Sequence, residues 1–390
     1  MKILHIAPNA PYNDNWGYQD NLLPRYQKKM GHEVSIIVPT LMHQDGTIVQ
    51  TAESRYYLDD GVEVIRKNYN NYLIPEITEL LTKMKIYDVL IEKEPNFIFF
   101  HGLISSTIFD VIKYKRKVNR RCIIVEDNHL DYNIGSHSTG LKLLLGRGYF
   151  RWRNRATISY ISKVYGVTPW RKKYAEEYFR IPREKTDVLI MGADDEKIDF
   201  QNRSSIRETI RNSYGISPQD FLIVTGGKID KNKKIHILMN AVAQMKNVKL
   251  LIFGQVADDI RKEFDGLLMD NNNIEYVGWI DADEVYNYFF AADLVCFPGQ
   301  HSVLWEQACA SKVPCLFERW EGMEHVDNGG NSDFLNQVTE ESIREKITEL
   351  CYTGKYYSMK RAAESDLTDI YLYSKIAEKS LECAAKNEKC

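Results

Sequence analysis

Apolar residues along this chain are grouped in short runs that predict buried strands separated by helices. The runs at 97–100 and 294–297 have the length of strands covered on both faces of a sheet. Further strands are expected at 2–8, 33–39, 63–67, 122–125, 163–167, 187–191, 221–225, 249–253, 274–277 and 315–317. Apolar residues at helical spacing predict helices at 18–30, 77–93, 106–117, 141–160, 169–179, 204–214, 235–245, 282–291 and 303–310. This alternation predicts an α/β fold with parallel sheets and right-handed crossovers.

The alternation of strands and helices runs through the chain twice. A polar, charge-rich connector at 192–201 interrupts it, and the series restarts at the expected strand 221–225. We therefore expect two Rossmann-like domains, at 1–192 and 193–365, followed by a C-terminal helical segment at 366–390. A chain of 390 residues is long enough to bury two cores.

Composition narrows the class of protein. With 44% hydrophobic and 27% charged residues, the chain resembles a globular enzyme. No apolar run has the length of a membrane-spanning helix, and the N-terminus reads as a strand without a signal-peptide pattern. The seven cysteines are odd in number and show no paired metal spacing. We expect a cytoplasmic protein that has no metal site.

The net charge of −3 conceals an asymmetry between the two halves. Residues 1–190 carry 28 Lys and Arg against 21 Asp and Glu, whereas the remainder carries 23 against 33. A basic first half and an acidic second half indicate different partners for each. No nucleic-acid recognition motif is present, so we do not expect nucleic acid as a partner.

The segment that follows the expected strand 294–297 has the pattern of a ligand-binding turn. A Pro-Gly pair ends the strand, and Ser302 is the expected N-cap of the helix 303–310. A strand, a turn and a helix N-terminus place free backbone N–H groups where a phosphate can bind. Glu306 is expected on the face of this helix that a ligand would meet. An ordinary βαβ crossover with a solvated glutamate explains the pattern equally well.

A lysine-rich loop is expected after the strand 221–225. A Gly226-Gly227 turn leads into 228–234, which contains four lysines. Ammonium groups beside a helix N-terminus predict an anion site, although the pattern of a Walker loop is missing. The alternative is a solvated loop.

The expected strand 122–125 delivers polar residues to its carboxyl end, where open α/β sheets place their chemistry. His129 beside Asp127 is a candidate acid/base or polarising pair. A structural hydrogen bond between the two remains open. Gly17, at the junction of the first loop and helix, allows either a helix-start turn or close approach to a ligand.

Basic and large apolar residues are interleaved in the expected helix 141–160, and six basic residues fall within 113–121. Both features are typical of a surface that contacts anionic lipid. A helix with one core face and solvated arginines remains the alternative.

Segments along nearly the whole chain resemble family 4 of the retaining glycosyltransferases. That family has the GT-B architecture, in which two Rossmann-like domains face each other across a deep interdomain cleft. The resemblance is carried by Asn15-Trp16-Gly17-Tyr18, Gly31-His32-Glu33-Val34, Gly192-Ala193-Asp194, Gly227-Lys228 through Lys233, and Gly278-Trp279-Ile280. Lys228 stands where the family usually has arginine, and Glu306 falls on the second glutamate of the family's Glu-x7-Glu motif.

One position departs from the family pattern. Pro298 stands where the first glutamate of that motif is expected, and Pro298-Gly299-Gln300-His301 replaces the usual Glu-Gly-Phe-Gly. Since the first glutamate normally helps to bind the donor sugar, the departure bears on sugar choice and on activity.

The resemblance assigns expected roles to the candidate residues. His129 corresponds to a histidine beside the donor sugar, and we take His129 and Asp127 as the catalytic candidates. The expected nucleotide-sugar-binding residues are Gly17, Lys228, Lys233, Gly254, Trp279, Ile280, His301, Ser302, Val303, Leu304 and Glu306. Among these, Lys228 and Lys233 would meet the diphosphate, and Glu306 the ribose hydroxyls. The C-terminal helical segment is expected to pack back on the first domain.

The resemblance implies a metal-independent transfer of a sugar from a nucleotide diphosphate sugar, with retention of the anomeric configuration. On family grounds the donor is a UDP-sugar. The acceptor would be a glycan or a lipid-linked glycan in the synthesis of cell-surface polysaccharide or glycolipid. No cofactor is expected, and the protein would be cytoplasmic with peripheral contact to an anionic membrane. Two alternatives stay open: a pseudo-transferase that binds glycan or a partner subunit, and a UDP-sugar epimerase.

Overall fold

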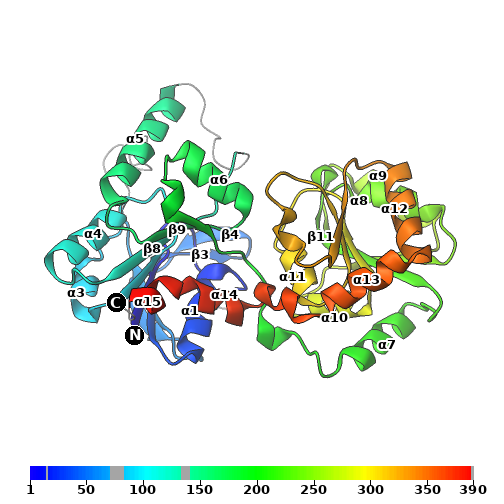
Figure 1. Ribbon diagram of the computed structural model, residues 1–390, viewed down its shortest axis with the longest axis horizontal. Helices are drawn as coiled ribbons and strands as arrows, with labels where there is room; N and C mark the ends of the chain where they lie inside the picture. Colours follow the sequence, from blue (N-terminus) through cyan, green and yellow to red (C-terminus); the bar gives the residue numbers. More distant parts are fainter. Residues whose placement is uncertain (15, 71–82, 133–140, 388–390) are drawn as a thin grey trace. The chain divides into compact units, whose positions relative to one another are not determined.

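A computed structural model describes residues 1–14, 16–70, 83–132 and 141–387 (Figure 1). The chain divides into two compact units, which are described separately below. Unit 1 consists of Met1–Ile190 together with Ile376–Cys390, and unit 2 consists of Met191–Lys375.

Unit 1 is built on an eight-stranded sheet. Its strands are β1 (Lys2–Ile6), β2 (Glu33–Pro39), β5 (Ser54–Tyr57), β6 (Glu63–Lys67), β7 (Phe97–Phe100), β8 (Ile123–Asn128), β9 (Lys163–Gly166) and β10 (Thr186–Val188). They are ordered β10-β9-β8-β7-β1-β2-β6-β5, and all pairs are parallel except the antiparallel pair of β5 with β6. A separate hairpin is formed by β3 (Leu41–Gln44) and β4 (Thr47–Gln50).

Helices connect these strands. They are α1 (Gln19–Lys29), α3 (Tyr87–Lys93), α4 (Ile108–Lys117), α5 (Leu141–Thr157), α6 (Pro169–Tyr178), the 3-10 turn η1 (Arg183–Lys185), and at the C-terminus α14 (Tyr373–Ser380) and α15 (Glu382–Asn387). The start of α6 shows how the sequence sets a boundary: the Thr168 side chain accepts from the Arg171 N–H, and Pro169 occupies the first helical position. The C-terminal helices lie beside α1 (Figure 1, red and blue), where Ser380 hydrogen-bonds to Gln27.

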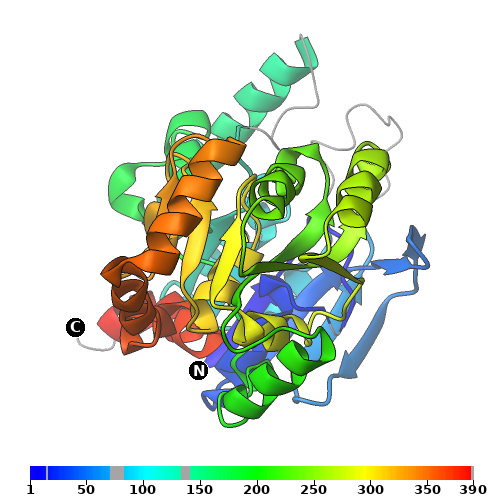
Figure 2. The same cartoon turned by 90° about the vertical axis from the view of Figure 1, so that its right-hand side faces the viewer.

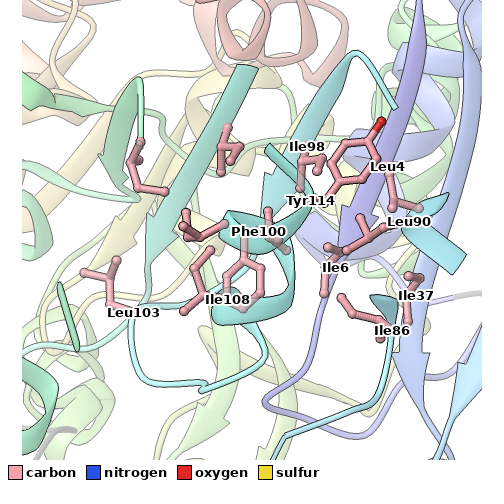
Figure 3. Close-up of a cluster of buried hydrophobic side chains, with 14 of the residues drawn as sticks. Leu4, Ile6, Ile37, Ile86, Leu90, Ile98, Phe100, Leu103, Ile108 and Tyr114 are labelled. Atoms are coloured by element: carbon pink, nitrogen blue, oxygen red, sulfur yellow. The ribbon is translucent and has the colours of Figure 1, made fainter. Parts of the chain in front are cut away.

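The central strands of unit 1 are buried on both faces of the sheet. Leu4 and Ile6 of β1, with Ile98 and Phe100 of β7, point into the core that α3 and α4 cover (Figure 3). Successive side chains of a strand point to opposite faces. His5 therefore lies on the other face of the sheet, a placement that matters for the site below.

Unit 2 is built on a six-stranded parallel sheet. Its strands are β11 (Phe221–Ile229), β12 (Val248–Val256), β13 (Ile274–Gly278), β14 (Leu294–Phe297), β15 (Cys315–Glu318) and β16 (Ser332–Leu335), in the order β13-β12-β11-β14-β15-β16. Its α-helices are α7 (Arg203–Ser213), α8 (Ile235–Ala243), α9 (Arg261–Asp270), α10 (Val285–Ala291), α11 (Leu304–Ala310), α12 (Glu340–Tyr352) and α13 (Gly354–Ala363). Short 3-10 turns are η2 (Asp195–Lys197), η3 (Lys231–Lys233), η4 (Glu324–Val326) and η5 (Asp366–Tyr371). Helix α12 packs beside α8 (Figure 2, orange and yellow-green).

These two parallel α/β sheets confirm the predicted fold class, and some predicted elements differ from the structure. Of the expected helix 77–93, residues 77–82 lie outside the described part, and only Tyr87–Lys93 is helical in the rest. The expected strand 122–125 continues to Asn128. The hairpin β3–β4, the strands β5 and β16 and the helices α9, α12 and α13 were not predicted, although α12 carries Ile343, Ile347 and Leu350 at helical spacing.

Within the described residues, none of the helices is long and apolar enough to span a lipid bilayer. Helix α5 also differs from the expected helix with solvated arginines, because Arg153 is fully buried and its guanidinium lies 2.9 Å from the buried Glu126 carboxylate. Trp152 of the same helix is exposed. In the basic run 113–121, the Lys115 ammonium donates to the Tyr160 carbonyl, so this lysine serves an internal contact.

We expect Arg153→Met to lower the free energy of unfolding by about 3–5 kcal/mol, because removing one partner of a buried ion pair leaves the other charge uncompensated. Arg155, exposed on the same helix, gives the control: Arg155→Met should change stability by roughly 0.5 kcal/mol or less. Urea unfolding of both variants measures the difference. Equal effects would contradict a structural role for the Arg153–Glu126 pair.

Candidate functional site

Glycines bring two strands of unit 2 into unusually close contact at the carboxyl edge of the sheet. Gly227 and Gly254 have φ of +99° and +117°, in the left-handed region, and they are paired in the register of β11 and β12. A Cβ on Gly254 would lie 1.9 Å from the Gly227 carbonyl oxygen. The predicted turn at Gly226-Gly227 is therefore wrong. Both strands continue past their glycines, which permit a close approach of backbones.

A third glycine seats the loop after β14 on the turn η3. A Cβ on Gly299 would lie 2.4 Å from the Asn232 carbonyl oxygen, and the Gln300 N–H donates to that same oxygen at 3.0 Å. The Lys233 ammonium donates to the carbonyl oxygens of Gln300 at 2.6 Å and His301 at 3.3 Å. This close packing fixes Lys233 against the loop, and burial lowers the pKa of Lys233.

The two predicted phosphate-binding lysines have different environments. Lys228 lies in β11 with a side chain that is 71% exposed, and it pairs with Asp230 at 3.2 Å. Asp230 in turn caps η3 by accepting from the N–H groups of Asn232 and Lys233. The structure thus brings Lys228 and Lys233 to the same sheet edge, with one free to reach into solvent and the other held.

The helix after this loop begins later than predicted. Helix α11 starts at Leu304, its N-cap is Val303, and no side chain caps it. The predicted capping by the Ser302 hydroxyl is therefore wrong. Ser302, Val303 and Leu304 supply the backbone at the start of the helix, and their binding of an anion stays a prediction.

Glu306 is completely buried, which contradicts the solvated glutamate, while its expected role toward a ligand stays a prediction. The Nε2 of His301 donates to its two carboxylate oxygens at 2.9 and 3.1 Å, and the Nε2 of His325 donates at 2.8 Å. Burial alone would raise the pKa of Glu306, but the two histidines lower this pKa to about 2. Glu306 is thus a structural anion that ties the loop after β14 to η4.

The end of β13 provides one exposed aromatic ring. Trp279 follows the last residue of β13 and is 73% exposed, whereas its neighbour Ile280 is buried. Of the two predicted nucleotide-sugar-binding residues in this segment, Trp279 is therefore the one whose side chain is open to solvent.

In unit 1 the alternation of β8 separates four polar residues into two pairs. Glu126 faces Arg153, and the Asn128 amide donates to the Leu130 and Arg171 carbonyl oxygens. Asp127 and His129 point to the opposite side. The strand continues through Asn128, so sheet register fixes Asp127, and His129 directly follows the strand.

Asp127 is the centre of the polar cluster in unit 1. One carboxylate oxygen accepts from the Gly102 N–H at 2.8 Å. The other lies 2.8 Å from Nδ1 of His101 and 3.3 Å from Nε2 of His129. Burial alone would raise the pKa of Asp127, but the two histidines hold this pKa well below its usual range. The predicted pair of Asp127 and His129 is confirmed as a contact, and the His129 side chain, 42% exposed, is its accessible member.

Two further features surround this cluster. Asp20 lies in the first turn of α1, and burial raises its pKa. The charges of His101 and His129 oppose that rise, which shows that Asp20 interacts electrostatically with both rings. Gly17 is exposed, and a Cβ there would meet open space. The fold itself therefore does not require glycine at 17, and its role toward a ligand stays a prediction. Asn15, beside it, lies outside the described residues.

Three histidines were not predicted from the sequence: His101 and His325, which belong to the two clusters, and His5, which contacts His101. His101 directly follows the apolar strand 97–100. A polar residue at that position indicates a candidate site at the carboxyl edge of the sheet, so this histidine could have been found. His5 interrupts the apolar strand β1, which is a weaker signal. His325 stands alone in an irregular segment, and nothing in the sequence pattern marks it.

Each cluster places three ionisable side chains with nitrogen or oxygen atoms within 4.8 Å of one another. Hydrogen bonds from histidine to carboxylate link the members and compensate the buried charge, so we describe both as hydrogen-bonded clusters. The absence of a metal requirement stays a prediction.

We expect Gly299→Ala to weaken nucleotide binding and to destabilise unit 2, because its Cβ would meet the backbone of η3, which cannot rotate away. Gly266→Ala is the matched control, since this glycine lies inside α9 with open space at its Cβ. Alanine in a helix interior should stabilise by roughly 0.5–1 kcal/mol. Thermal unfolding with and without nucleotide measures both. A Gly299→Ala protein that behaves like the control would contradict the close packing.

Glu306 gives a pH-dependent prediction. Its pKa is lower in the folded protein than in the unfolded chain, so its contribution to stability is present above the unfolded value and is lost as pH falls toward about 2. Relative to Glu306→Gln, the unfolding free energy of the unaltered protein should therefore decrease by about 3 kcal/mol between about pH 5 and about pH 2. Denaturant titrations at several pH values measure this difference. The same pH dependence in both proteins would show that the two histidines do not stabilise the Glu306 carboxylate.

Comparison with known proteins supports this description. Residues 206–364 match the family model described as "Glycosyl transferases group 1". A search of curated proteins returned no match.

Solved structures with the same fold cover nearly the whole chain. A glycosyltransferase from Rickettsia africae is 15% identical, with a TM-score of 0.70, 97% of this chain covered and 96% of that one. Anabaena Alr3699/HepE, solved in complex with UDP, is 16% identical, with a TM-score of 0.66 and coverage of 99% and 100%. UDP-GlcNAc 2-epimerase from Neisseria meningitidis, bound to UDP-GlcNAc, is 14% identical, with a TM-score of 0.58 and coverage of 99% and 100%. The chain thus has the two-domain α/β fold of GT-B glycosyltransferase structures, and its residues 206–364 match the family model of the group 1 glycosyl transferases.

Proposed function

We propose that this protein is a retaining glycosyltransferase of family 4. It moves a sugar from a nucleotide diphosphate sugar, UDP-sugar in our proposal, to a glycan or lipid-linked acceptor. The acceptor class and a role in cell-surface polysaccharide or glycolipid synthesis rest on the resemblance in sequence.

The observation that carries this proposal is the carboxyl edge of the sheet in unit 2. Two close-packed glycines, an exposed lysine, a held lysine and an exposed tryptophan come together along the edge formed by β11, β12, β13 and β14. The match to the glycosyltransferase family model falls within the same unit. HepE, which shares the fold, binds UDP. Ligands of open α/β sheets bind outside the carboxyl ends of the strands.

We assign the diphosphate to Lys228, Lys233 and the backbone of 302–304. A leaving diphosphate carries negative charge that two ammonium groups and oriented N–H groups can stabilise, so no metal or other cofactor is needed in this proposal. Lys228 reaches the ligand with an exposed side chain, and Lys233 contributes from a fixed position. Trp279 would contact the base.

Glu306 has a different role from the one that the resemblance implies. Its carboxylate accepts from His301 and His325, so a ribose could reach it only after His301 had moved. We propose that Glu306 acts mainly by holding His301 and the loop that Pro298 begins.

In unit 1 we propose His129 as the catalytic residue and Asp127 as the group that orients it. His129 has the most exposed side chain of the Asp127 cluster, so it is the member that can meet a substrate. We also propose a cytoplasmic protein that contacts anionic membrane through the basic first half. The exposed Trp152 on α5, beside the exposed Arg155, supports that contact.

The experiment that tests this function is product analysis with a panel of UDP-sugars and glycan acceptors. Transfer predicts free UDP together with a glycosylated acceptor, and retention predicts that the sugar keeps its anomeric configuration. An epimerised sugar formed without acceptor would favour the epimerase, whose fold is also shared. Nucleotide binding without any product would favour the pseudo-transferase, for which Pro298 gives a reason.

Lys233→Ala should weaken binding of UDP by about tenfold or more and leave binding of uridine nearly unchanged, because the lysine is proposed to meet only the diphosphate. Lys231→Ala, exposed on the same turn, is the control and should affect neither ligand. Calorimetric titration with UDP and uridine separates the two effects. Equal losses for both ligands would place Lys233 in loop structure alone.

A further inference from the structure

A continuous series of hydrogen-bonded side chains, buried except for His129 at one end, crosses unit 1 on the face of the sheet opposite the core that α3 and α4 cover. His5 of β1 lies in register with Phe99 of β7, so His101, two residues further along, is on the same face. The same register places Asp127 there from β8. In order, the members of the series are His129, Asp127, His101, His5, Gln27 of α1 and Ser380 of α14.

The far end of the series fixes the direction of its hydrogen bonds. The Ser380 hydroxyl lies 2.6 Å from the Ala377 carbonyl oxygen, which can only accept, so the hydroxyl donates. Ser380 must then accept from the amide nitrogen of Gln27 at 2.8 Å. The Gln27 oxygen is left facing Nε2 of His5 at 2.8 Å, so that ring nitrogen donates.

The direction continues through the two histidines. Burial, with the charge of His101, lowers the pKa of His5 to about 3, so His5 is neutral and its Nδ1 is an acceptor. His101 must therefore donate to it from Nε2, at 3.1 Å. Its other nitrogen, Nδ1, lies 2.8 Å from the ionised Asp127 and also donates. A ring that donates from both nitrogens is an imidazolium.

The charges around His101 agree with this assignment. Burial alone would lower its pKa, but Asp127 and Asp20 raise it above the ordinary value. The ionisable groups that face this ring are His5 from β1, Asp20 from α1, and Asp127 from β8, with His129 on the far side of Asp127. One positive and one negative charge then compensate each other in the buried part of the series, as burial requires.

We propose that Ser380, Gln27 and His5 are positioning residues that fix His101 as an imidazolium, so that Asp127 stays ionised and holds His129 by its Nε2. The C-terminal segment thereby contributes to the site in unit 1 through Ser380. The catalytic consequence rests on the proposed function, whereas the protonation of His101 does not.

Gln27→Leu removes the amide that sets the donor-to-acceptor direction of these hydrogen bonds. Without the amide oxygen, His5 can keep its proton on Nδ1 and donate to His101. Nε2 of His101 then becomes an acceptor, and the ring loses its positive charge. Gln19→Leu is the matched control, because Gln19 is buried on the same helix and its amide has no hydrogen-bond partner among the described residues.

The first measurement is nitrogen NMR of the full chain with histidine labelled at its ring nitrogens. The signals of His101 are assigned by their loss in His101→Gln. We expect both ring nitrogens of His101 to carry protons at neutral pH in the unaltered protein and in Gln19→Leu, and only one to do so in Gln27→Leu. A neutral His101 ring in the unaltered protein would overturn the proposal, and so would an unchanged imidazolium in Gln27→Leu. Ser380→Ala, which leaves the Gln27 amide free to rotate, should lower the pKa of His101 in the same direction.

Kinetics tests the consequence for the site. Gln27→Leu should lower kcat by roughly 10- to 100-fold, as expected for loss of a hydrogen bond to a charged group, with KM for the UDP-sugar nearly unchanged. Loss of folding alone would reduce the active fraction and not the pKa of His101. If the unaltered protein transfers no sugar, the proposed function fails while the NMR result still decides the protonation of His101.

Discussion

A buried carboxylate must be paired, and this requirement organises the carboxyl edge of both sheets. Asp127 in unit 1 and Glu306 in unit 2 are completely inaccessible to solvent, and each is held by two histidines. An unpaired charge in such a place would cost several kcal/mol, so the partners are as necessary as the carboxylates. The partner His325 joins η4 to α11, whereas His101 and His129 lie at the ends of the neighbouring strands β7 and β8.

The two pairings have different consequences for chemistry. His301 and His325 are nearly buried with Glu306, and the cluster fixes a loop. Around Asp127, one histidine is buried and the other is 42% exposed. The buried ring supplies the charge that the carboxylate needs, and the exposed ring is left to meet a substrate. We propose that positive charge for a diphosphate comes instead from the lysines at the edge of unit 2, where glycines let the backbone segments approach closely.

Much of the fold could be predicted because burial on both faces leaves a strong pattern. The strands at 33–39, 63–67, 97–100 and 294–297 have the predicted limits. Local sequence signals for turns and helix caps were misleading where tertiary contacts determine the local conformation. Gly226-Gly227 reads as a turn by composition, yet the pair lies within β11, whose pairing with β12 continues past both glycines. The Ser302 hydroxyl reads as a cap but does not cap α11.

The position of the candidate site in the fold could be predicted from the sequence, but the partners of its buried carboxylates could not. Asp127 with His129 followed from the end of a strand, and Lys228 and Lys233 from a cluster of like charges. The partners His5, His101 and His325 depend on sheet register and on a contact distant in sequence, which spacing does not encode. The burial of Glu306 could not be predicted either, since a glutamate near the start of a helix is ordinarily solvated.

Titration calorimetry with UDP, GDP, ADP and dTDP in the presence of EDTA tests the central claim most directly. The account predicts selective binding of one nucleotide, UDP in our proposal, without a divalent metal, because lysines and backbone N–H groups compensate the diphosphate. Binding of none of the four, or binding that requires a divalent metal, would contradict it.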